Sequence, residues 1–381
     1  MKPILLLLFP ILTGLAFSDD PVPKVLPIGS PLPAFSLAGI DGKTHTETAY
    51  ADAKILCIIF TCNHCPDSVA AAARTEQIHQ AYKDKGVAIV AVNANNAKSL
   101  RPDELVYSPY GDSFEEMKPF AASFGWTFPY LYDGETQTFA TACGAQSTPH
   151  VFVFDAERKL RYTGRMDDAG RSSEPVEKSY LCDALDALLA GKEVAEAVTR
   201  SFGCSTKWLF KGNSVQKEQK ASEEMPITLD ELDEPLAKKL RENKSGNVRV
   251  INFWSTTCGP CVAEFPDLVE TYRRFQNRNV DFISISMDPI EQKAKVKKFL
   301  ESRHAALSAR TKPSMEKEDR NSNNYIWNGS NPDKLAEAVY PEWTGALPLT
   351  LIISPEGKIL WNHSEQIDVV ELRTQILKGL K

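Results

Sequence analysis

The stretch ILCIIFTCNHCP (residues 55–66) runs from an apolar segment directly into two cysteines that are separated by two residues. The stretch VRVINFWSTTCGPC (residues 248–261) repeats this order. Short apolar runs of this composition predict buried strands, and the segments after each pair carry the apolar spacing of a helix. A proline stands 87 residues after Cys62 and 90 residues after Cys258, each at the start of another apolar run. The two halves therefore predict one α/β fold used twice.

Composition divides the chain into four parts. Residues 1–18 combine a lysine, an apolar core and small residues before the expected cleavage point, which predicts a secretory signal peptide. Alternating strands and helices predict one α/β domain over residues 25–207 and a second over residues 225–381, each with a central mixed sheet flanked by helices. Residues 211–224 hold one apolar residue larger than alanine, so we expect a flexible linker there.

The expected elements follow from the periodicity of apolar residues. In the first half we expect strands at 55–60, 87–92, 130–132, 151–154 and 160–162, and helices at 67–83, 114–124 and 174–189. In the second half we expect helices at 228–240 and 262–275, and strands at 248–254, 281–286, 349–353 and 358–361. The polar block 310–324 predicts an exposed insertion.

Charge and hydropathy exclude several functions. The net charge of −6 argues against a nucleic-acid partner, because a phosphate-binding surface needs clustered Lys and Arg. The apolar part of residues 1–18 is shorter than the ~20 residues that a membrane-spanning helix needs. We therefore expect a secreted or periplasmic protein with no stable membrane span, and an uncleaved anchor is the alternative.

Eight cysteines in an exported chain would usually indicate structural disulfides. A pair with two residues between its members closes too small a loop to stabilise a fold through chain entropy, so the two tight pairs indicate redox chemistry. Cys-x-x-Cys is also half of a zinc site, but a structural zinc needs four ligands, and no second Cys/His pair follows at that spacing. We expect no metal and no cofactor. The pairing of four further cysteines is left open: Cys57, Cys143, Cys182 and Cys204.

The position of each pair predicts the roles of its sulfurs. A cysteine at the N-terminus of a helix faces free N–H groups and the positive end of the helix dipole, which favour its thiolate. We expect Cys62 and Cys258 to lie there and to be the attacking sulfurs, while Cys65 and Cys261 resolve the mixed disulfide. We expect His64 to favour the Cys62 thiolate and so to make the first pair the more oxidising one. The alternative is an exposed loop histidine with little effect.

Residues 225–381 resemble the TlpA/ResA branch of the thioredoxin superfamily, which contains exported thiol–disulfide oxidoreductases. The resemblance rests on the stretch NFWSTTCGPCVAEFP (residues 252–266). It implies that Glu264 carries the proton of Cys261. An ordinary solvated glutamate in the first helical turn is the alternative, because acidic residues are common there.

Residues 25–207 resemble the redoxin-like group related to alkyl hydroperoxide reductase and thiol-specific antioxidant proteins. The matching stretches are residues 60–66, 148–155, 184–192 and 203–208. The last stretch contains Cys204, for which a resolving role and a structural disulfide both stay open. The peroxidatic signature Pro-x-x-x-Thr/Ser-x-x-Cys is missing, because Ile59 stands three residues before Cys62. Together the two resemblances imply two tandem thioredoxin-like folds.

The same fold implies a cis proline that faces the first cysteine of each pair. Pro149 and Pro348 stand at the corresponding positions, directly after Thr148 and Leu347. These four residues are expected to hold an incoming peptide through main-chain hydrogen bonds. Without the paired cysteines, each proline would be interpreted as a strand-edge proline.

The sequence thus predicts an exported thiol–disulfide oxidoreductase whose partners are protein thiols or disulfides and an upstream electron donor. A flexible linker would also let Cys258 reduce the first domain through a mixed disulfide with Cys62. Three alternatives stay open. They are a thiol peroxidase reduced by its own second domain, a copper or zinc carrier using Cys62, His64 and Cys65, and a scaffold with one redox-inactive domain.

Overall fold

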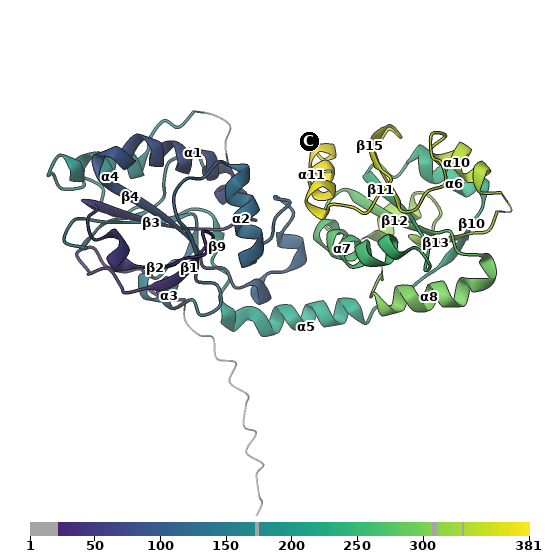
Figure 1. Ribbon diagram of the computed structural model, residues 1–381, viewed down its shortest axis with the longest axis horizontal. Coiled ribbons are helices and arrows are strands. Elements are labelled where there is room, and N and C mark those ends of the chain that lie inside the picture. The colour runs from purple at the N-terminus through teal and green to yellow at the C-terminus, as the bar shows by residue number, and fades with distance from the viewer. Residues whose placement is uncertain (1–21, 172–174, 307–310, 330) are drawn as a thin grey trace, which may run out of the picture.

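The computed structural model describes residues 22–171, 175–306, 311–329 and 331–381. These residues form two α/β domains joined by a helix (Figure 1). The expected signal peptide, residues 1–18, lies outside the described residues. Every helix in the described part of the chain is too short or too polar to cross a membrane.

The first domain is built on a seven-stranded mixed sheet with the order β2-β1-β5-β4-β3-β7-β8. Its central strand β3 (Ile55–Thr61) pairs in parallel with β4 (Val87–Asn93) and antiparallel with β7 (His150–Phe154). Every residue of β3 is buried, which explains its continuous apolar sequence. The remaining strands are β1 (Ser36–Gly39), β2 (Thr44–Thr46), β5 (Tyr130–Tyr132) and β8 (Leu160–Gly164), with a separate pair β6 (Ser147–Thr148) and β9 (Cys204–Ser205).

Two apolar clusters cover the two faces of this sheet, and alternate residues of β3 contribute to each. Helices α1 (Pro66–Tyr82), α2 (Phe114–Ser123) and α4 (Tyr180–Leu189) supply side chains to the first cluster. Helix α3 (Thr138–Cys143) supplies the second. Short 3₁₀ turns complete the domain: η1 (Glu47–Tyr50), η2 (Lys83–Lys85), η3 (Ala97–Ser99), η4 (Pro102–Glu104) and η5 (Leu209–Lys211).

The second domain repeats this plan on a six-stranded mixed sheet with the order β10-β13-β12-β11-β14-β15. Its central strand β11 (Val248–Trp254) pairs in parallel with β12 (Val280–Ser286) and antiparallel with β14 (Leu349–Ile353). The other strands are β10 (Asp230–Leu232), β13 (Asn324–Trp327) and β15 (Ile359–His363). The helices are α6 (Glu234–Glu242), α7 (Gly259–Phe275), η6 (Ile290–Gln292), α8 (Lys293–Ser302), α9 (Lys312–Glu316), α10 (Pro332–Val339) and α11 (Val369–Gly379). The predicted fold class, two tandem thioredoxin-like domains, is confirmed.

Two predictions about polar segments of the second domain are wrong. The segment 228–240 is not one helix, because residues 230–232 pair as β10 beside β13 before α6 begins. The described part of block 310–324 is buried in part and not exposed throughout, because Arg320 and the fully buried Arg249 both bond to Asp281, at 2.7 and 2.8 Å. Charged residues can be buried when they are paired, and these partners are far apart in sequence.

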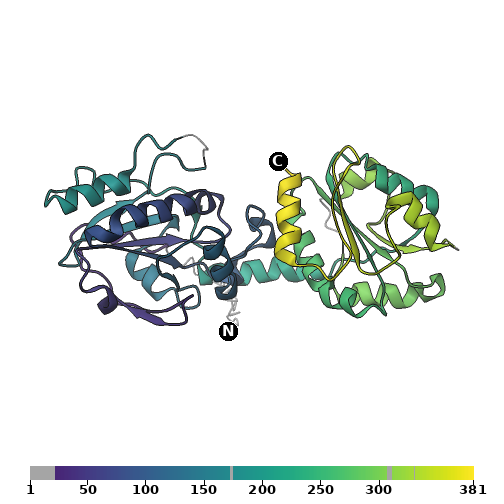
Figure 2. The same cartoon turned by 45° about the horizontal axis from the view of Figure 1, so that its top comes forward.

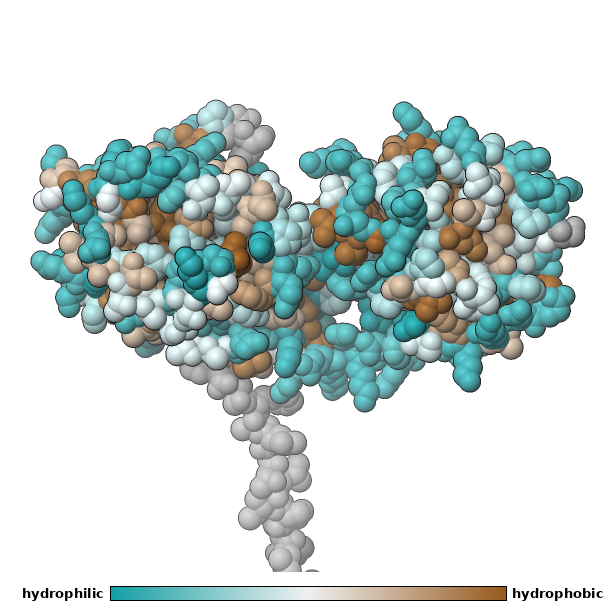
Figure 3. All heavy atoms as spheres, in the orientation of Figure 1, coloured by the Kyte–Doolittle hydropathy of each residue, from teal (hydrophilic) through white to brown (hydrophobic). Residues whose placement is uncertain are grey.

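The connection between the domains is helical rather than flexible. Residues 212–223 form α5 (Gly212–Glu223), which bridges the two domains in Figure 1 and carries mostly hydrophilic side chains in Figure 3. The segment therefore connects the two domains as a helix, and not as the irregular segment that its polar composition suggested. Lys, Gln, Glu and Ala favour helix, so a helix that connects two domains can form here without an apolar face of its own.

The first domain also touches the second through α2 and the loop that precedes it. Helix α11 lies on the side of the second domain that faces the first (Figure 2), and Arg373 of α11 donates to the Pro109 carbonyl at 3.3 Å. Arg274 of α7 lies 3.6 Å from Glu116. Val106 is buried as a member of the apolar core of the second domain.

Candidate functional site

In the second domain, Cys258 and Cys261 form a disulfide at the start of α7. Cys258 is the N-cap residue, and its Sγ accepts a hydrogen bond from the Cys261 N–H at 3.3 Å. Cys258 is partly exposed, whereas Cys261 is buried. The prediction that the first cysteine of this pair lies at the helix start is confirmed.

Glu264 lies one helical turn after Cys261 and is buried, so the alternative of a solvated glutamate is wrong. Its carboxylate accepts hydrogen bonds from Asn252 Nδ2 at 3.1 Å and from the Ile367 N–H at 2.9 Å. Burial raises the pKa of Glu264 above its ordinary value despite these hydrogen bonds. A raised pKa favours the protonated form of the carboxyl group, which suits a proton carrier.

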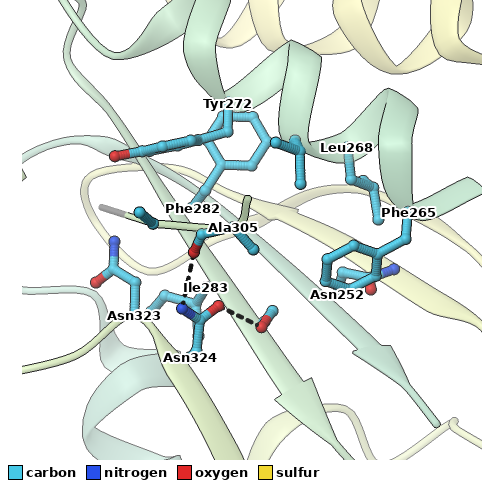
Figure 4. A pocket seen from close by; sticks show the side chains of 12 residues that line it. Asn252, Phe265, Leu268, Tyr272, Phe282, Ile283, Ala305, Asn323 and Asn324 are labelled. Carbon is cyan, nitrogen blue, oxygen red and sulfur yellow. Dashed lines mark hydrogen bonds between the residues drawn. The ribbon is translucent and has the colours of Figure 1, made fainter. Parts of the chain in front are cut away.

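A small apolar cavity of about 60 Å³ lies between α7 and strands β11 and β12 (Figure 4). Phe265, Leu268 and Tyr272 line it from α7, and Asn252 lines it from the sheet. The Asn252 Oδ1 atom is buried without a hydrogen-bond partner among the described residues. The cavity thus lies behind the Asn252–Glu264 contact, on the core side of the helix, and we assign it no substrate role.

Both predicted cis prolines are confirmed. The Thr148–Pro149 and Leu347–Pro348 bonds are cis. Leu349, directly after Pro348, pairs with Phe253 of β11, the strand that leads to Cys258. The proline segment and the disulfide of the second domain therefore lie at the same end of the sheet.

In the first domain, Cys62 and Cys65 are free thiols, and both are fully buried. Helix α1 begins at Pro66, with Cys65 rather than Cys62 as its N-cap. The prediction that Cys62 lies at the helix start is therefore wrong. A proline disfavours the helical conformation in the residue before it, and Cys65 is accordingly extended, with φ −64° and ψ 126°.

A third cysteine completes this site. The Cys204 N–H donates to Cys65 Sγ at 3.3 Å, and Cys204 pairs with Thr148 across β9 and β6. Cys62 Sγ lies 3.2 Å from Thr148 Oγ1, and Cys65 Sγ lies 3.1 Å from the Thr148 carbonyl oxygen. The site therefore contains three sulfurs around Thr148. The sequence left a resolving role or a structural disulfide open for Cys204, but its place beside Cys65 could not be derived from the sequence.

The thiols of this site differ in pKa. A hydrogen bond from the Cys204 thiol lowers the pKa of Cys65 far below its ordinary value, and the Cys62 thiol acts in the same direction. Burial, together with the bond to Cys65, raises the pKa of Cys62. The geometry therefore favours a thiolate at Cys65, and the prediction of a low pKa at Cys62 is wrong. In its thiol form, Cys65 can instead donate to the Thr148 carbonyl.

His64 is buried, so the alternative of an exposed loop histidine is wrong. Its Nδ1 lies 2.7 Å from Asp112 Oδ2, and Asp112 also accepts from the His64 N–H at 3.2 Å and from Asn95 Nδ2 at 2.7 Å. Burial alone would lower the pKa of His64, but the charge and the hydrogen bond of Asp112, together with smaller effects, raise it above its ordinary value. The charge of Cys65 acts in the same direction, so the imidazolium supports the Cys65 thiolate. Nothing in the local sequence around Asp112 predicted this contact.

Two groups of residues could offer ligands to a metal ion. They are Cys62 with His64 and Asp112, and Cys65 with Asp67 and Cys204. The Asp112 oxygens already accept four hydrogen bonds, so hydrogen bonding accounts for the first group without an ion. Asp67 of the second group pairs with Arg171 at 2.8 Å. The alternative copper or zinc set of Cys62, His64 and Cys65 is neither of these groups in the part of the chain that the structure describes.

Comparison with known proteins places both domains. Residues 27–179 match the Redoxin family and residues 227–362 match the AhpC/TSA family. The thiol-disulfide oxidoreductase ResA of Geobacillus thermodenitrificans (strain NG80-2) is 27% identical over 141 residues, 36% of this chain and 71% of that protein. The thiol-disulfide oxidoreductase ResA of Bacillus subtilis (strain 168) is 29% identical over 110 residues, 29% of this chain and about half (49%) of that protein.

Two solved structures share more sequence with this chain. A hypothetical protein from Sinorhizobium meliloti 1021 is 32% identical, with a TM-score of 0.44, and the match covers 49% of this chain and 96% of that chain. An uncharacterized conserved protein from Geobacillus kaustophilus is 38% identical, with a TM-score of 0.43, and the match covers 48% of this chain and 92% of that chain. Residues 27–179 therefore form a Redoxin domain and residues 227–362 an AhpC/TSA domain, two thioredoxin-like domains in tandem, and the chain is an oxidoreductase similar to ResA-type thiol–disulfide oxidoreductases.

Proposed function

We propose that this protein is an exported thiol–disulfide oxidoreductase with two dithiol sites, Cys62/Cys65 and Cys258/Cys261, that exchange disulfides with protein partners. One observation supports this function above the others. Each pair lies where a central strand leads into a long helix, beside a proline segment. Helix termini stabilise the thiolate on which disulfide exchange depends.

In the second site, Cys258 is the attacking sulfur because it is partly exposed at the helix start. Cys261 resolves the mixed disulfide, and Glu264 supplies or accepts its proton. Leu347 and Pro348 contact the incoming peptide. Export rests on the leader-like composition of residues 1–18.

In the first site, Thr148 and Pro149 take the corresponding place beside the sulfurs, and His64 supports the thiolate. An external electron donor would serve each site separately. A direct Cys62–Cys258 relay is unfavourable in this arrangement, because Cys62 is fully buried and the first domain meets α7 near Arg274, at the opposite end from Cys258. At 1.5 Å per residue, Cys258 and Arg274 are separated by ~24 Å along the axis of α7.

Silencing one site at a time tests the proposed function. Full-length C258S/C261S and C62S/C65S variants would each be equilibrated with glutathione redox buffers, and the remaining pair would be mapped by mass spectrometry. We expect one exchangeable disulfide in each variant and exchange with reduced, unfolded ribonuclease. A pair that fails to cycle would leave its domain as a scaffold, and hydroperoxide consumption dependent on Cys62 would favour a peroxidase instead.

A further inference from the structure

The sulfurs of the first site differ in their access to solvent. Cys62 and Cys65 are fully buried, whereas Cys204 is partly exposed. Disulfide exchange requires an incoming sulfur to approach the sulfur that it attacks. A protein partner can therefore approach Cys204 in this arrangement, but not the Cys-x-x-Cys pair itself.

The placement of Cys204 is built into the fold. Gly203 has φ +147°, and a Cβ at this position would lie 2.0 Å from the Thr148 carbonyl oxygen. Only glycine therefore allows β9 to approach Thr148 this closely. The result is that the Cys204 and Cys65 sulfurs and an Asp67 carboxylate oxygen lie within 4.8 Å of one another.

We propose that Cys204 is a third redox-active cysteine, which passes the disulfide of the buried Cys62–Cys65 pair to a protein dithiol through a Cys65–Cys204 disulfide. This inference deepens the proposed function and rests on it. Cys65 is then the central sulfur of the site, in contact with one buried and one accessible partner.

Each step conserves atoms and electrons. The Cys204 thiolate attacks Cys65 Sγ of the oxidised pair, the Cys65–Cys204 bond forms, and Cys62 leaves and takes up the proton that Cys204 released. A partner thiolate then attacks Cys204 Sγ, and Cys65 leaves as a thiolate. The second thiol of the partner attacks its own bound sulfur, which forms the partner disulfide and releases Cys204. One protein dithiol is oxidised and one enzyme disulfide is reduced, and the reverse sequence reduces a partner disulfide.

The surroundings of the two sulfurs fit these roles. Cys65 is the best leaving group of the three because hydrogen bonding lowers its pKa. The hydrogen bond to the Cys65 thiolate raises the pKa of Cys204. Cys65 carries no charge while it is part of a disulfide, so this effect is absent when Cys204 attacks. Burial raises the pKa of Cys62, so this sulfur takes up the proton after it leaves.

The experiment traps the intermediate in the full-length chain with the second site silenced by C258S/C261S. In this parent, C62S would be oxidised with diamide and its disulfides mapped by mass spectrometry. We expect a Cys65–Cys204 cross-link in at least half of the molecules, and none when C204S is added. C182S is the matched control, because Cys182 is also partly exposed but lies on α4. C182S should leave the cross-link unchanged.

A rate measurement separates this inference from the proposed function. We expect C204S alone to slow disulfide exchange with unfolded reduced ribonuclease at least tenfold, while diamide still closes Cys62–Cys65. Exchange at the parent rate, or a folded C62S protein without the cross-link, would overturn the role of Cys204. Zinc or copper that co-purifies in a Cys204-dependent manner and blocks the cross-link would make the cluster a metal site instead. A parent that does not exchange at all contradicts the proposed function of this domain, and the cross-link still decides whether Cys204 joins Cys65.

Discussion

Strand β3 leads into Cys62/Cys65 and strand β11 leads into Cys258/Cys261 with the same two-residue spacing, yet the two helices begin at different places. Helix α7 begins directly after Cys258, whereas α1 begins only after Cys65. The position of the proline accounts for the difference. Pro260 lies inside the second pair, but Pro66 follows the first, so the helix dipole acts on different sulfurs. Spacing alone therefore does not tell which cysteine is the thiolate.

The surroundings of the two pairs differ as well. The first site has a buried His64–Asp112 pair and a third cysteine. The second domain contains no cysteine besides Cys258 and Cys261, and its buried titratable neighbour is Glu264. The first site is arranged to hold negative charge on sulfur, and the second to hold a proton on a carboxyl group.

The largest expected difference concerns the thiolate of the first site. Thiolate absorbance at 240 nm in the reduced C258S/C261S protein should persist well below the ordinary thiol pKa of ~8.5. The additional change C65S should abolish this signal, because hydrogen bonding lowers the pKa of Cys65, whereas C62S should keep it. Loss of the signal in C62S but not in C65S would restore Cys62 as the thiolate and make the two sites alike.

The next largest effect should come from Gly203, which has no counterpart beside the second pair. We expect G203A to lower the free energy of unfolding by ~3 kcal/mol or more, because its Cβ would meet the Thr148 carbonyl oxygen. G191A is the matched control, since Gly191 also has a positive φ, +67°, but open space around its Cβ. Its cost should stay near ~1 kcal/mol. Denaturant unfolding measures the loss of free energy of unfolding in both variants. Equal losses in G203A and G191A would show that β9 can move away from Thr148.

The His64–Asp112 pair should contribute a pH dependence that the second site lacks. Because the folded pKa of His64 is raised, its stabilisation is complete below about pH 6.5, the ordinary value, and is lost as pH rises through the folded pKa. The lowered pKa of Asp112 gives a stabilisation that is present above its ordinary value and lost as pH falls through the folded pKa.

The variant D112N should cost ~2 kcal/mol at pH 6, because an isolated buried imidazolium is unfavourable and the ring then deprotonates. D112N should also remove the decline in stability that the wild-type protein shows as pH rises through the folded pKa of His64. D103N, at a carboxylate outside the site, is the control. Unfolding curves of D112N that keep the wild-type slope between pH 6 and 9 would contradict the ion-pair assignment.

The smallest effect should come from Glu264. Its folded pKa is raised, so the native state holds more protons than the unfolded state above pH ~4.5, and stability falls as pH rises through the folded pKa. E264Q should flatten this decline, because glutamine does not titrate. E264Q should also slow the release of mixed disulfides from Cys258. The control E301Q, on the exposed side of α8, should change neither the pH dependence of stability nor this release rate. If E264Q leaves release unaffected, Glu264 has only a structural role.

The central elements were predictable because their signals are local. The expected strand 55–60 is observed as residues 55–61, and the expected helix 67–83 as residues 66–82. Strand 248–254 was placed correctly, and both cis prolines were expected from the resemblance to the thioredoxin fold and their positions relative to the paired cysteines. Continuous apolar runs in buried strands leave little ambiguity over these lengths.

The parts that sequence analysis missed depend on contacts between distant segments. Asp112 binds His64 from 48 residues away, and Cys204 meets Cys65 from 139 residues away. The two-residue strands β6 and β9 are too short to leave a periodic pattern. Residues 212–223 were misjudged for a different reason, because a polar composition excludes an apolar core but does not exclude a helix.

Val106 has a consequence for any attempt to produce the halves of this protein separately. It belongs to the first domain in sequence but is buried in the apolar core of the second. A fragment that begins at residue 225 would expose to water the apolar core residues that Val106 covers in the full chain. A fragment that ends before residue 225 would expose the Val106 side chain on its loop. Supplying the loop around Val106 as a peptide should therefore improve the solubility of the isolated second half.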